Sequence, residues 1–197
     1  MTTTQTDTRT RILDTAWTLI RRRGPAQVTV ADIAKGAGVS RQLVYVHFAN
    51  RAGLLVGVAR HHDASSGFVE RVAATRRLPP ADGLEALLRL WCAYIPEILP
   101  FARALEAAAT TGDEGGTAWH DRMDDLWEAF RVAVDRVHRD GRLADRWTVR
   151  TATDWIWARS HLATWQHLVG ERGWRPADYT EQAVRSILAE VLAPARP

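Results

Sequence analysis

The chain has 197 residues, of which 46% are hydrophobic and 25% are charged, a composition typical of a folded globular protein and not of a disordered one. It contains neither an uninterrupted run of 18 apolar residues nor a signal-type N-terminus, so we expect a cytoplasmic protein. The net charge is only +3, but residues 1–60 hold nine Lys or Arg against three Asp or Glu, which places the field that attracts a polyanion on this segment.

Apolar residues recur at helical spacing along most of the chain, and no segment alternates cleanly between apolar and polar residues as a strand would. The sequence therefore predicts an all-α protein. The first helix is expected from about Thr8 to Arg23, with Asp7 as its N-cap and Gly24-Pro25 as its end. Its buried stripe is expected to consist of Ile12, Leu13, Ala16, Trp17, Leu19 and Ile20.

The segment from residue 30 to residue 48 has the pattern of two short helices joined by a tight turn. Thr29 is placed to cap the first of them, and Asp32 can return a hydrogen bond, as in a capping box. Gly38 can adopt the positive φ that ends a helix within a short turn, and Ser40 is placed to cap the second helix. These features predict a helix-turn-helix.

The second helix of this motif is expected to have one buried face and one free face. The core residues expected around it are Ile33, Ala37, Val44, Phe48, Leu13, Trp17 and Ile20. The free face carries Arg41, Gln42, Tyr45 and Val46 near its N-terminal end, which is where such a helix meets base edges in the major groove. Gln42 is suited to adenine, Arg41 to guanine, and an apolar side chain to a thymine methyl group.

The run T-V-A-D-I-A-K-G-A-G-V-S-R-Q-L-V-Y-V-H-F-A-N-R-A-G-L-L, which starts at Thr29, resembles the DNA-binding domain of TetR-family regulators, and the match covers residues 10–55. The agreeing positions are Thr29, Ala34, Gly38, Val39, Ser40, Tyr45, His47, Phe48, Asn50, Arg51, Leu54 and Leu55. The resemblance implies phosphate contacts from Thr29, Tyr45, His47 and Arg51 and base contacts from Arg41, Gln42 and Leu43, with Ser40 and Val46 in the same interface.

Two residues depart from the family's pattern. Leu43 stands where the family usually has a small residue, and Val46 stands where it commonly has a polar or aromatic one, so the match does not give the operator sequence. The alternative for the whole segment is an αα-hairpin of an unrelated bundle, with Tyr45 as a packing residue and His47 as a surface histidine. The joint occurrence of cap, turn glycine and tyrosine favours the helix-turn-helix.

Proline and glycine divide the remaining sequence into five or six further helices, which gives about nine in total. The longest patterns span about Thr117–Arg139, Thr148–Val169 and Tyr179–Leu192. Helix breaks are expected at Pro96 and Pro100. The expected architecture is thus an N-terminal three-helix DNA-binding domain followed by a larger helical domain.

We expect residues 1–52 to form the DNA-binding domain and residues 53–197 to form a helical regulatory and dimerisation domain. A reader of about 50 residues cannot by itself set two half-sites about 34 Å apart, so the remainder must supply a homodimer contact. The family resemblance implies a four-helix bundle made by the last two helices of each subunit. The residues expected to face the partner are Trp155, Arg159, Leu162, Gln166, Val169, Ala183, Ile187 and Val191.

Eight of the nine tryptophans, from Trp91 onward, lie outside the reader segment. Aromatic side chains line many apolar ligand pockets, so we expect a pocket for a hydrophobic or aromatic inducer. Its candidate residues, which have helical spacing, are Trp91, Tyr94, Ile98, Phe101, Trp119, Met123, Trp127, Phe130, Trp157 and His161. The same spacing builds any bundle interior, and plain core packing is the alternative for each residue.

The sequence contains no G-x-S-x-G elbow, no glycine-rich phosphate loop and no H-E-x-x-H helix, so we expect neither enzyme activity nor a cofactor. The single cysteine, Cys92, has no second thiol for a disulfide or a metal site and is expected to be a small buried residue.

Two histidine pairs invite a metal-site interpretation. Adjacent residues on a helix point about 100° apart, so His61 and His62 do not converge, and His161 and His167 do not share a helix face. We therefore expect no metal site, and a solvated linker is the preferred interpretation of His61-His62-Asp63.

The sequence predicts a dimeric transcriptional regulator, a repressor that binds a pseudo-palindromic operator and is released by a small ligand. Ligand binding in the larger domain is expected to act on the DNA-binding domain through a helix at residues 53–62. It would do so by shifting the population of the dimer between a DNA-binding and a non-binding conformation. A ligand-independent architectural or co-regulatory DNA-binding protein is the alternative, and an enzyme that carries a helix-turn-helix is a third.

Overall fold

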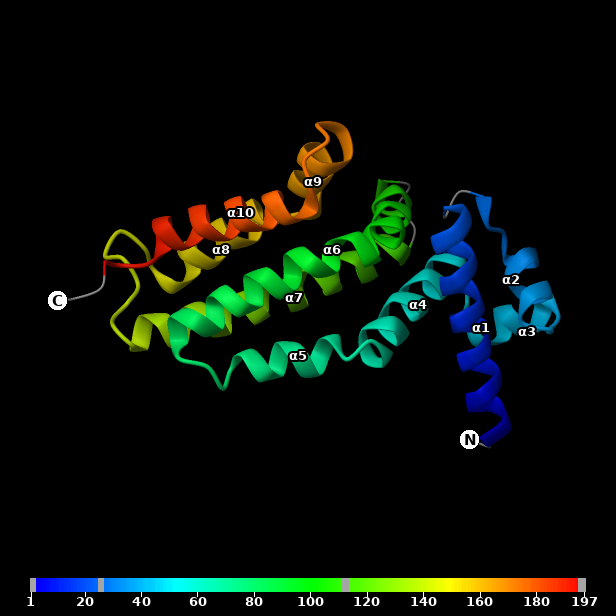
Figure 1. Ribbon diagram of the computed structural model, residues 1–197. Helices are drawn as coiled ribbons and strands as arrows, with labels where there is room; N and C mark the ends of the chain where they lie inside the picture. The colour runs from blue at the N-terminus through cyan, green and yellow to red at the C-terminus, as the bar shows by residue number, and fades with distance from the viewer. Residues whose placement is uncertain (1–2, 25–26, 111–113, 195–197) are drawn as a thin grey trace. The chain divides into compact units, whose positions relative to one another are not determined.

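The computed structural model describes residues 3–24, 27–110 and 114–194, and helices dominate these ranges (Figure 1). The all-α expectation is confirmed. The helices are α1 (Thr3–Arg23), α2 (Val30–Gly36), α3 (Arg41–His47), α4 (Arg51–Ser65), α5 (Phe68–Thr75), α6 (Pro80–Thr110), α7 (Glu114–Arg139), α8 (Val149–Arg159), α9 (Leu162–Trp165), the π-helical η2 (Gln166–Glu171) and α10 (Pro176–Val191). Within these ranges no helix is both long and apolar enough to cross a membrane.

The chain folds into two compact units. The first contains Met1–Phe68 together with Glu97–Arg122, and the second contains Val69–Pro96 together with Met123–Pro197. Helix α4 and the second half of α6 therefore belong to the same unit as the helix-turn-helix. A functional boundary at residue 52 stays a prediction.

Helix α1 begins earlier than the sequence suggested. It starts at Thr3, so Asp7 lies within the helix and pairs with Arg11 at 3.9 Å, and the expected cap at Asp7 is wrong. No proline or glycine precedes Asp7 to prevent the extra turn. Of the expected stripe, Ile12, Leu13, Ala16 and Ile20 are at most 1% exposed, whereas Trp17 and Leu19 are only half-buried.

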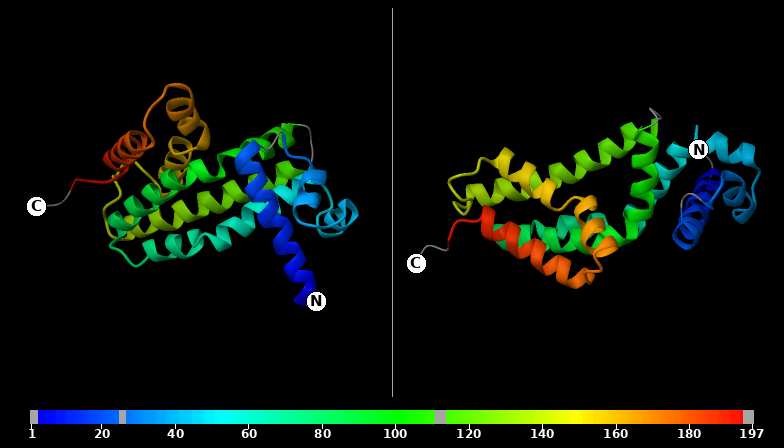
Figure 2. Two further views of the ribbon diagram at one scale, coloured as in Figure 1. Left: turned by 45° about the vertical axis from the view of Figure 1, so that its right-hand side comes forward. Right: turned by 90° about the horizontal axis from the view of Figure 1, so that it is seen from above.

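Helices α1 to α4 build the core of the first unit, with α1 packed against both α2 and α4 (Figure 2). The four motif residues expected in this core, Ile33, Ala37, Val44 and Phe48, are at most 5% exposed, which confirms the prediction. The Nε atom of Arg11 donates to the carbonyl of Ala37 at 2.9 Å and so ties α1 to the end of α2. This packing leaves the opposite side of α3 facing solvent.

A glycine allows α4 to approach its neighbours closely. A Cβ atom on Gly57 would lie 2.9 Å from Cε1 of Phe48 and 3.3 Å from Cδ2 of Leu13. Both neighbours are core side chains that have little room to move. The contact of α4 with α1 and with the end of α3 therefore depends on the missing side chain.

In the second unit, α8 and α10 lie side by side (Figure 2). The single helix expected at about 148–169 is interrupted. At the interruption, the Ser160 carbonyl accepts a hydrogen bond from Nε1 of Trp91 at 2.8 Å, and Nδ1 of His161 accepts one from the amide of Ala163 as the cap of α9. The chain thus ends α8 at Arg159 and starts a new helix.

The breaks expected at Pro96 and Pro100 are absent, because both prolines lie inside the described span of α6. A proline removes one helical hydrogen bond, but burial of the flanking apolar residues can hold the helix together. Ile95 and Phe101, which neighbour the two prolines, are at most 1% exposed. Burial of the neighbouring side chains therefore outweighs the tendency of the two prolines to break the helix.

We predict that Gly57→Ala lowers the free energy of unfolding, because overpacking costs about 1–3 kcal/mol and outweighs the roughly 1 kcal/mol gain in helix propensity. Gly53→Ala on the same helix is the control, since its new Cβ would meet only Oδ1 of Asn50 at 3.4 Å. We expect this control to be neutral or slightly stabilising. Thermal unfolding followed by circular dichroism compares the two, and equal stability of both variants would contradict the close approach.

Candidate nucleic-acid interface

Helix α2 begins in a complete capping box. The Thr29 hydroxyl oxygen accepts from the Asp32 amide at 3.1 Å, and the Thr29 amide and hydroxyl donate to Oδ2 of Asp32 at 2.9 and 2.6 Å. These hydrogen bonds, first from the hydroxyl and then from the amide, lower the pKa of Asp32. The capping prediction is confirmed, and Thr29 is anchored in a fixed position at the start of α2.

The turn between α2 and α3 has the expected geometry. Gly38 adopts φ +66°, a left-handed conformation that favours glycine, and Val39 donates to the Ala34 carbonyl at 2.9 Å. The Ser40 hydroxyl then accepts from the Leu43 amide at 3.1 Å and caps α3. Two helices joined in this way make a helix-turn-helix, as the sequence predicted.

Helix α3 exposes an unusual amount of apolar surface for its length of seven residues. Val44, which faces the core, is 1% exposed, whereas Leu43, Tyr45 and Val46 are 36%, 44% and 68% exposed. Arg41 and Gln42 are exposed as well. The side chains expected to contact bases therefore stand on one accessible helix, which is held from behind by buried residues.

The remaining two candidates for phosphate contacts lie at the edge of this surface. The His47 ring is half-buried and tilted against the Phe48 ring, with 6.3 Å between ring centroids. Nη1 of Arg51 donates to the Val28 carbonyl at 2.5 Å and so holds the segment before α2 against the start of α4. Arg51 thus has a structural contact, and its expected role on a phosphate stays a prediction.

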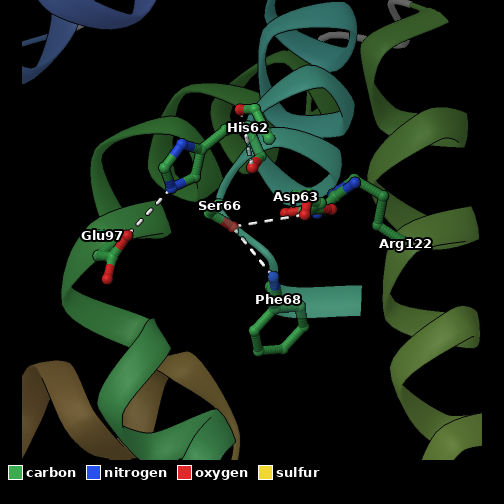
Figure 3. A network of polar contacts seen from close by, with 7 residues as sticks. His62, Asp63, Ser66, Phe68, Glu97 and Arg122 are labelled. Atoms are coloured by element: carbon green, nitrogen blue, oxygen red, sulfur yellow. Dashed lines mark hydrogen bonds and ion pairs between the residues drawn. The ribbon is translucent and has the colours of Figure 1, made fainter. Parts of the chain in front are cut away.

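His62, near the end of α4, makes two contacts with other helices, one with α6 and one with α1. Its Nε2 lies 3.0 Å from Oε2 of Glu97 (Figure 3). Its ring stacks on Trp17 of α1 with 3.5 Å between centroids. Trp17 also stacks on Phe101, with centroids 4.5 Å apart and an interplanar angle of 6°. Four aromatic or charged side chains thereby connect α1, α4 and α6.

A second tie joins α4 to α7. Asp63 forms an ion pair with Arg122, and their side chains are 16% and 13% exposed (Figure 3). The Ser66 hydroxyl, just after α4, donates to the Asp63 carbonyl and accepts from the Phe68 amide. These two hydrogen bonds stabilise the turn between α4 and α5. We call the pairs His62–Glu97 and Asp63–Arg122, with the stacked Trp17 and Phe101, the α4 clamp.

The clamp overturns the expectation of a solvated linker at residues 61–63. His61 also pairs across helices, with 2.8 Å between its Nε2 and Oδ1 of Asp14. The sequence gave no sign of the partners of these residues, because the carboxylates that pair with His62 and His61 lie 35 and 47 residues away and the arginine that pairs with Asp63 lies 59 residues away. Long-range pairing of this kind has no local pattern. Phe101, a candidate ligand contact, is 1% exposed and part of the clamp, and its contact with a ligand stays a prediction.

Most of the candidate ligand residues are core residues in the structure. Trp91, Tyr94, Ile98, Met123 and Phe130 are at most 8% exposed. Trp119 lies in a stretch of α7 whose side chains are outside the described residues.

The other tryptophans of this set are held by hydrogen bonds. Nε1 of Trp127 donates to Oδ1 of Asp154 at 2.8 Å. Nε1 of Trp157 donates to the Met123 carbonyl at 3.2 Å, and the Trp157 ring lies 5.1 Å from the His161 ring. Part of the predicted set, Met123, Trp157 and His161, is therefore brought together, and its use for a ligand stays a prediction.

A cavity of about 240 Å³ lies elsewhere in the second unit, between α8, α9, η2 and α10. Its lining residues are Ala158, Arg159, Thr164, Leu168, Trp174, Tyr179, Gln182, Ala183, Ser186 and Ile187. None of the candidate ligand residues lines it. Cys92 is 2% exposed, as expected, and burial raises the pKa of its thiol to about 12, which leaves it protonated and inert at neutral pH.

The residues expected to face a partner subunit divide into two groups. Leu162, Ile187 and Val191 are 2%, 1% and 0% exposed within the single chain. They pack in the subunit's own core, so their assignment to a partner-facing surface is wrong. Trp155 is 37% exposed, and Val169 is half-buried. Within the part of the chain that the structure describes, no three His, Cys, Asp or Glu side chains gather as a metal site would require.

Comparisons with known proteins agree on one family. Residues 12–58 match the bacterial regulatory proteins of the tetR family. The HTH-type transcriptional repressor BepR of Brucella suis is 23% identical over 212 residues, which cover 96% of this chain and 94% of that protein. The HTH-type transcriptional regulator EthR of Mycobacterium tuberculosis is 31% identical over 140 residues, which cover 68% of this chain and 63% of that protein.

A solved structure extends the likeness to nearly the whole fold. A protein described as a transcriptional regulator of Saccharomonospora viridis, solved in complex with choline, superposes with a TM-score of 0.79 at 21% identity. The superposition covers 95% of this chain and 99% of that one. The helical arrangement of the chain is therefore the one found in these regulators.

We predict that Asp63→Asn lowers the free energy of unfolding by about 1.5–3 kcal/mol, because it leaves a largely buried guanidinium without its carboxylate. Asp7→Asn is a matched control, since the Asp7 side chain is 75% exposed and lies 3.9 Å from its arginine. We expect the control to change stability by less than about 0.5 kcal/mol. Chemical denaturation measures both, and a control as damaging as Asp63→Asn would contradict the clamp.

Proposed function

We propose that this chain, which belongs to the TetR family of bacterial regulatory proteins, is a dimeric transcriptional repressor that binds a pseudo-palindromic operator through α3 and is released from it by a small ligand. The family match over residues 12–58 and the whole-chain likeness to named regulators support the DNA-binding role.

The observation that carries the proposal is the exposed face of α3. Large apolar side chains are normally buried, yet Leu43, Tyr45 and Val46 are 36%, 44% and 68% exposed beside two polar residues able to read base edges. A surface with this mixture suits the major groove, where hydrogen-bonding edges alternate with thymine methyl groups. Residues 1–60 hold nine basic and three acidic residues, whereas the rest of the chain holds more acidic than basic residues, and this distribution suits approach of the first segment to a polyanion.

A second copy of the chain is expected to contact the surface of α8 and α10. Trp155 on α8 and Trp174 before α10 are 37% and 39% exposed, and the small residues Ala158 and Ala183 line the cavity together with Trp174. Exposed indoles beside small side chains favour close helix packing in a symmetric interface. A dimer of this kind would present two α3 helices to two half-sites of one operator.

The proposed release by a ligand rests on the clamp and on the fold. A regulator of the same fold was solved with choline bound, which supports a ligand-responsive role here. The α4 clamp joins the helix-turn-helix to residues 97–122 within one compact unit. A ligand that prefers one arrangement of this segment would shift operator affinity by its differential binding energy, typically about 1–3 kcal/mol.

The test is an electrophoretic shift of the purified protein on DNA from the region upstream of its own gene, at a fixed salt concentration, with scrambled DNA alongside. We expect specific retardation at nanomolar protein. Tyr45→Ala removes an exposed side chain of α3 and is expected to weaken operator binding about five- to 150-fold, which corresponds to a loss of roughly 1–3 kcal/mol in a well-placed contact.

Val69→Ala serves as the control variant, since Val69 is 55% exposed on α5 and lies outside residues 12–58, which match the family's DNA-binding domain. We expect it to bind like the wild type. If the upstream DNA and the scrambled DNA are retarded equally, the same assay is repeated on an unbiased set of genomic fragments. Equal retardation of all these fragments would contradict a sequence-specific regulator and favour the architectural alternative.

A further inference from the structure

The cavity of about 240 Å³ in the second unit is lined by α8, α9, η2, α10 and the turn before α10. All its lining residues belong to this one unit. Ala158 of α8 and Ala183 of α10 contribute only methyl groups to the lining, which leaves space between the two helices. A cavity of about 150 Å³ already accepts benzene, so this one has room for a molecule with one ring or a short apolar chain.

Part of the lining comes from a stretch of irregular backbone. Helix η2 is π-helical and contributes Leu168 to the cavity. Gly173 follows with φ +73°, in the left-handed region, and the Trp174 amide donates to the Leu168 carbonyl at 3.0 Å. This turn brings Trp174 to the same cavity, where its side chain is 39% exposed. π-Helical turns are rare and occur frequently at functional sites, so this geometry favours a binding role over plain packing.

The cavity lining, within the described part of the chain, includes one cation, Arg159, and no carboxylate. Nη2 of Arg159 donates to Oγ of Ser186 at 3.4 Å and lies 3.8 Å from Oε1 of Glu190. Charge-assisted hydrogen bonds of a guanidinium are normally about 2.7–2.9 Å long. Glu190 accepts instead from Nε1 of Trp155. The guanidinium of Arg159 is therefore only weakly compensated by the chain's own carboxylates.

A second hydrogen-bond donor belongs to Tyr179, near the start of α10, which also lines the cavity. Its side chain is 1% exposed, and its hydroxyl has no hydrogen-bond partner among the residues that the structure describes. Burial raises the pKa of this hydroxyl, which is therefore a neutral donor at neutral pH. Buried polar groups normally have a partner, and one that lacks it at a cavity is available to a ligand oxygen.

We propose that this cavity binds a small carboxylate that carries one ring or a short apolar chain. Arg159 pairs with the carboxylate, and the Tyr179 hydroxyl donates to it. Leu168, Trp174 and Ile187 pack against the apolar part. A guanidinium binds a carboxylate through two parallel hydrogen bonds, which the present contacts of Arg159 do not supply.

This site goes beyond the proposed function, because binding to it does not involve DNA and its lining contains none of the described candidate inducer residues. A second copy of the chain is the other possible occupant, since Trp174 is also proposed to contact a partner. The two occupants differ in a measurable way. A carboxylate depends on the charge of Arg159, whereas side chains of a second copy would fill the cavity and leave no room for a free carboxylate.

The first experiment is isothermal titration calorimetry of the full-length protein without DNA. The probes are phenylacetate and hexanoate, each compared with its neutral amide, phenylacetamide or hexanamide. We expect at least one carboxylate to bind once per chain, with a dissociation constant between about 10 µM and 1 mM for so small a molecule. Its amide should bind about tenfold more weakly, because hydrogen bonds between two charged groups are the stronger ones.

Absence of binding by both carboxylates would overturn the proposal and assign the cavity to contact with a second copy. Equal affinity for a carboxylate and its amide would overturn the role of the charge. Absence of operator binding by a protein that does bind the carboxylate would overturn only the proposed function.

The second experiment repeats the titrations with Arg159→Gln, which removes the charge but keeps an amide donor. We expect carboxylate affinity to fall about tenfold and amide affinity to stay within about twofold of the wild type. Arg150→Gln is the matched control, since Arg150 lies on the same helix and also has an ion pair of 3.8 Å, with Asp154. It should bind like the wild type, and equal carboxylate affinity of the two variants would overturn the role of Arg159.

Tyr179→Phe tests the buried hydroxyl while keeping the ring that lines the cavity. We expect carboxylate binding to weaken about fivefold through loss of one hydrogen bond. Thermal unfolding should show no loss of stability, because the hydroxyl has no partner within the described chain. Carboxylate binding equal to the wild type in a folded Tyr179→Phe protein would remove this hydroxyl from the site.

Discussion

The arrangement of the first unit depends on the stacking of Trp17 between helices that are far apart in sequence. Its indole meets the His62 ring at 3.5 Å and the Phe101 ring at 4.5 Å, and His62 in turn pairs with Glu97. Stacking fixes the ring planes, and the contact between His62 and Glu97 fixes the direction of these two side chains. Together with Asp63 and Arg122, these contacts hold α1, α4 and residues 97–122 as one body.

Packing of this kind explains why a short helix can present apolar side chains to solvent. Val44 and Phe48 anchor α3 from behind, and Gly57 lets α4 approach them closely. The hydroxyl groups of Thr29 and Ser40 each accept a hydrogen bond from one amide in the first turn of α2 and α3. The exposed side of α3 is thus held in place before any DNA arrives, so binding orders few additional groups.

Local patterns predicted the helix-turn-helix well, because its caps, its turn glycine and its buried stripe are all set by neighbouring residues such as Thr29, Gly38 and Val44. The clamp could not be predicted, since the partners of His62 and Asp63 lie on helices far along the chain. The breaks expected at Pro96 and Pro100 failed because burial of their neighbours outweighs local propensity. Helical spacing of apolar residues cannot distinguish a subunit's core from its interface. The residues that show this were expected to face a partner but are buried within the single chain: Leu162, Ile187 and Val191.

We expect the clamp to make the DNA-reading helices and residues 97–106 respond together to operator DNA. Hydrogen–deuterium exchange of the full-length protein with and without operator DNA tests it directly. The account predicts slower exchange on operator binding in α2 and α3, in the last turns of α4, and in residues 97–106 of α6. Slower exchange confined to α1–α3, with α4 and residues 97–106 unchanged, would contradict the account.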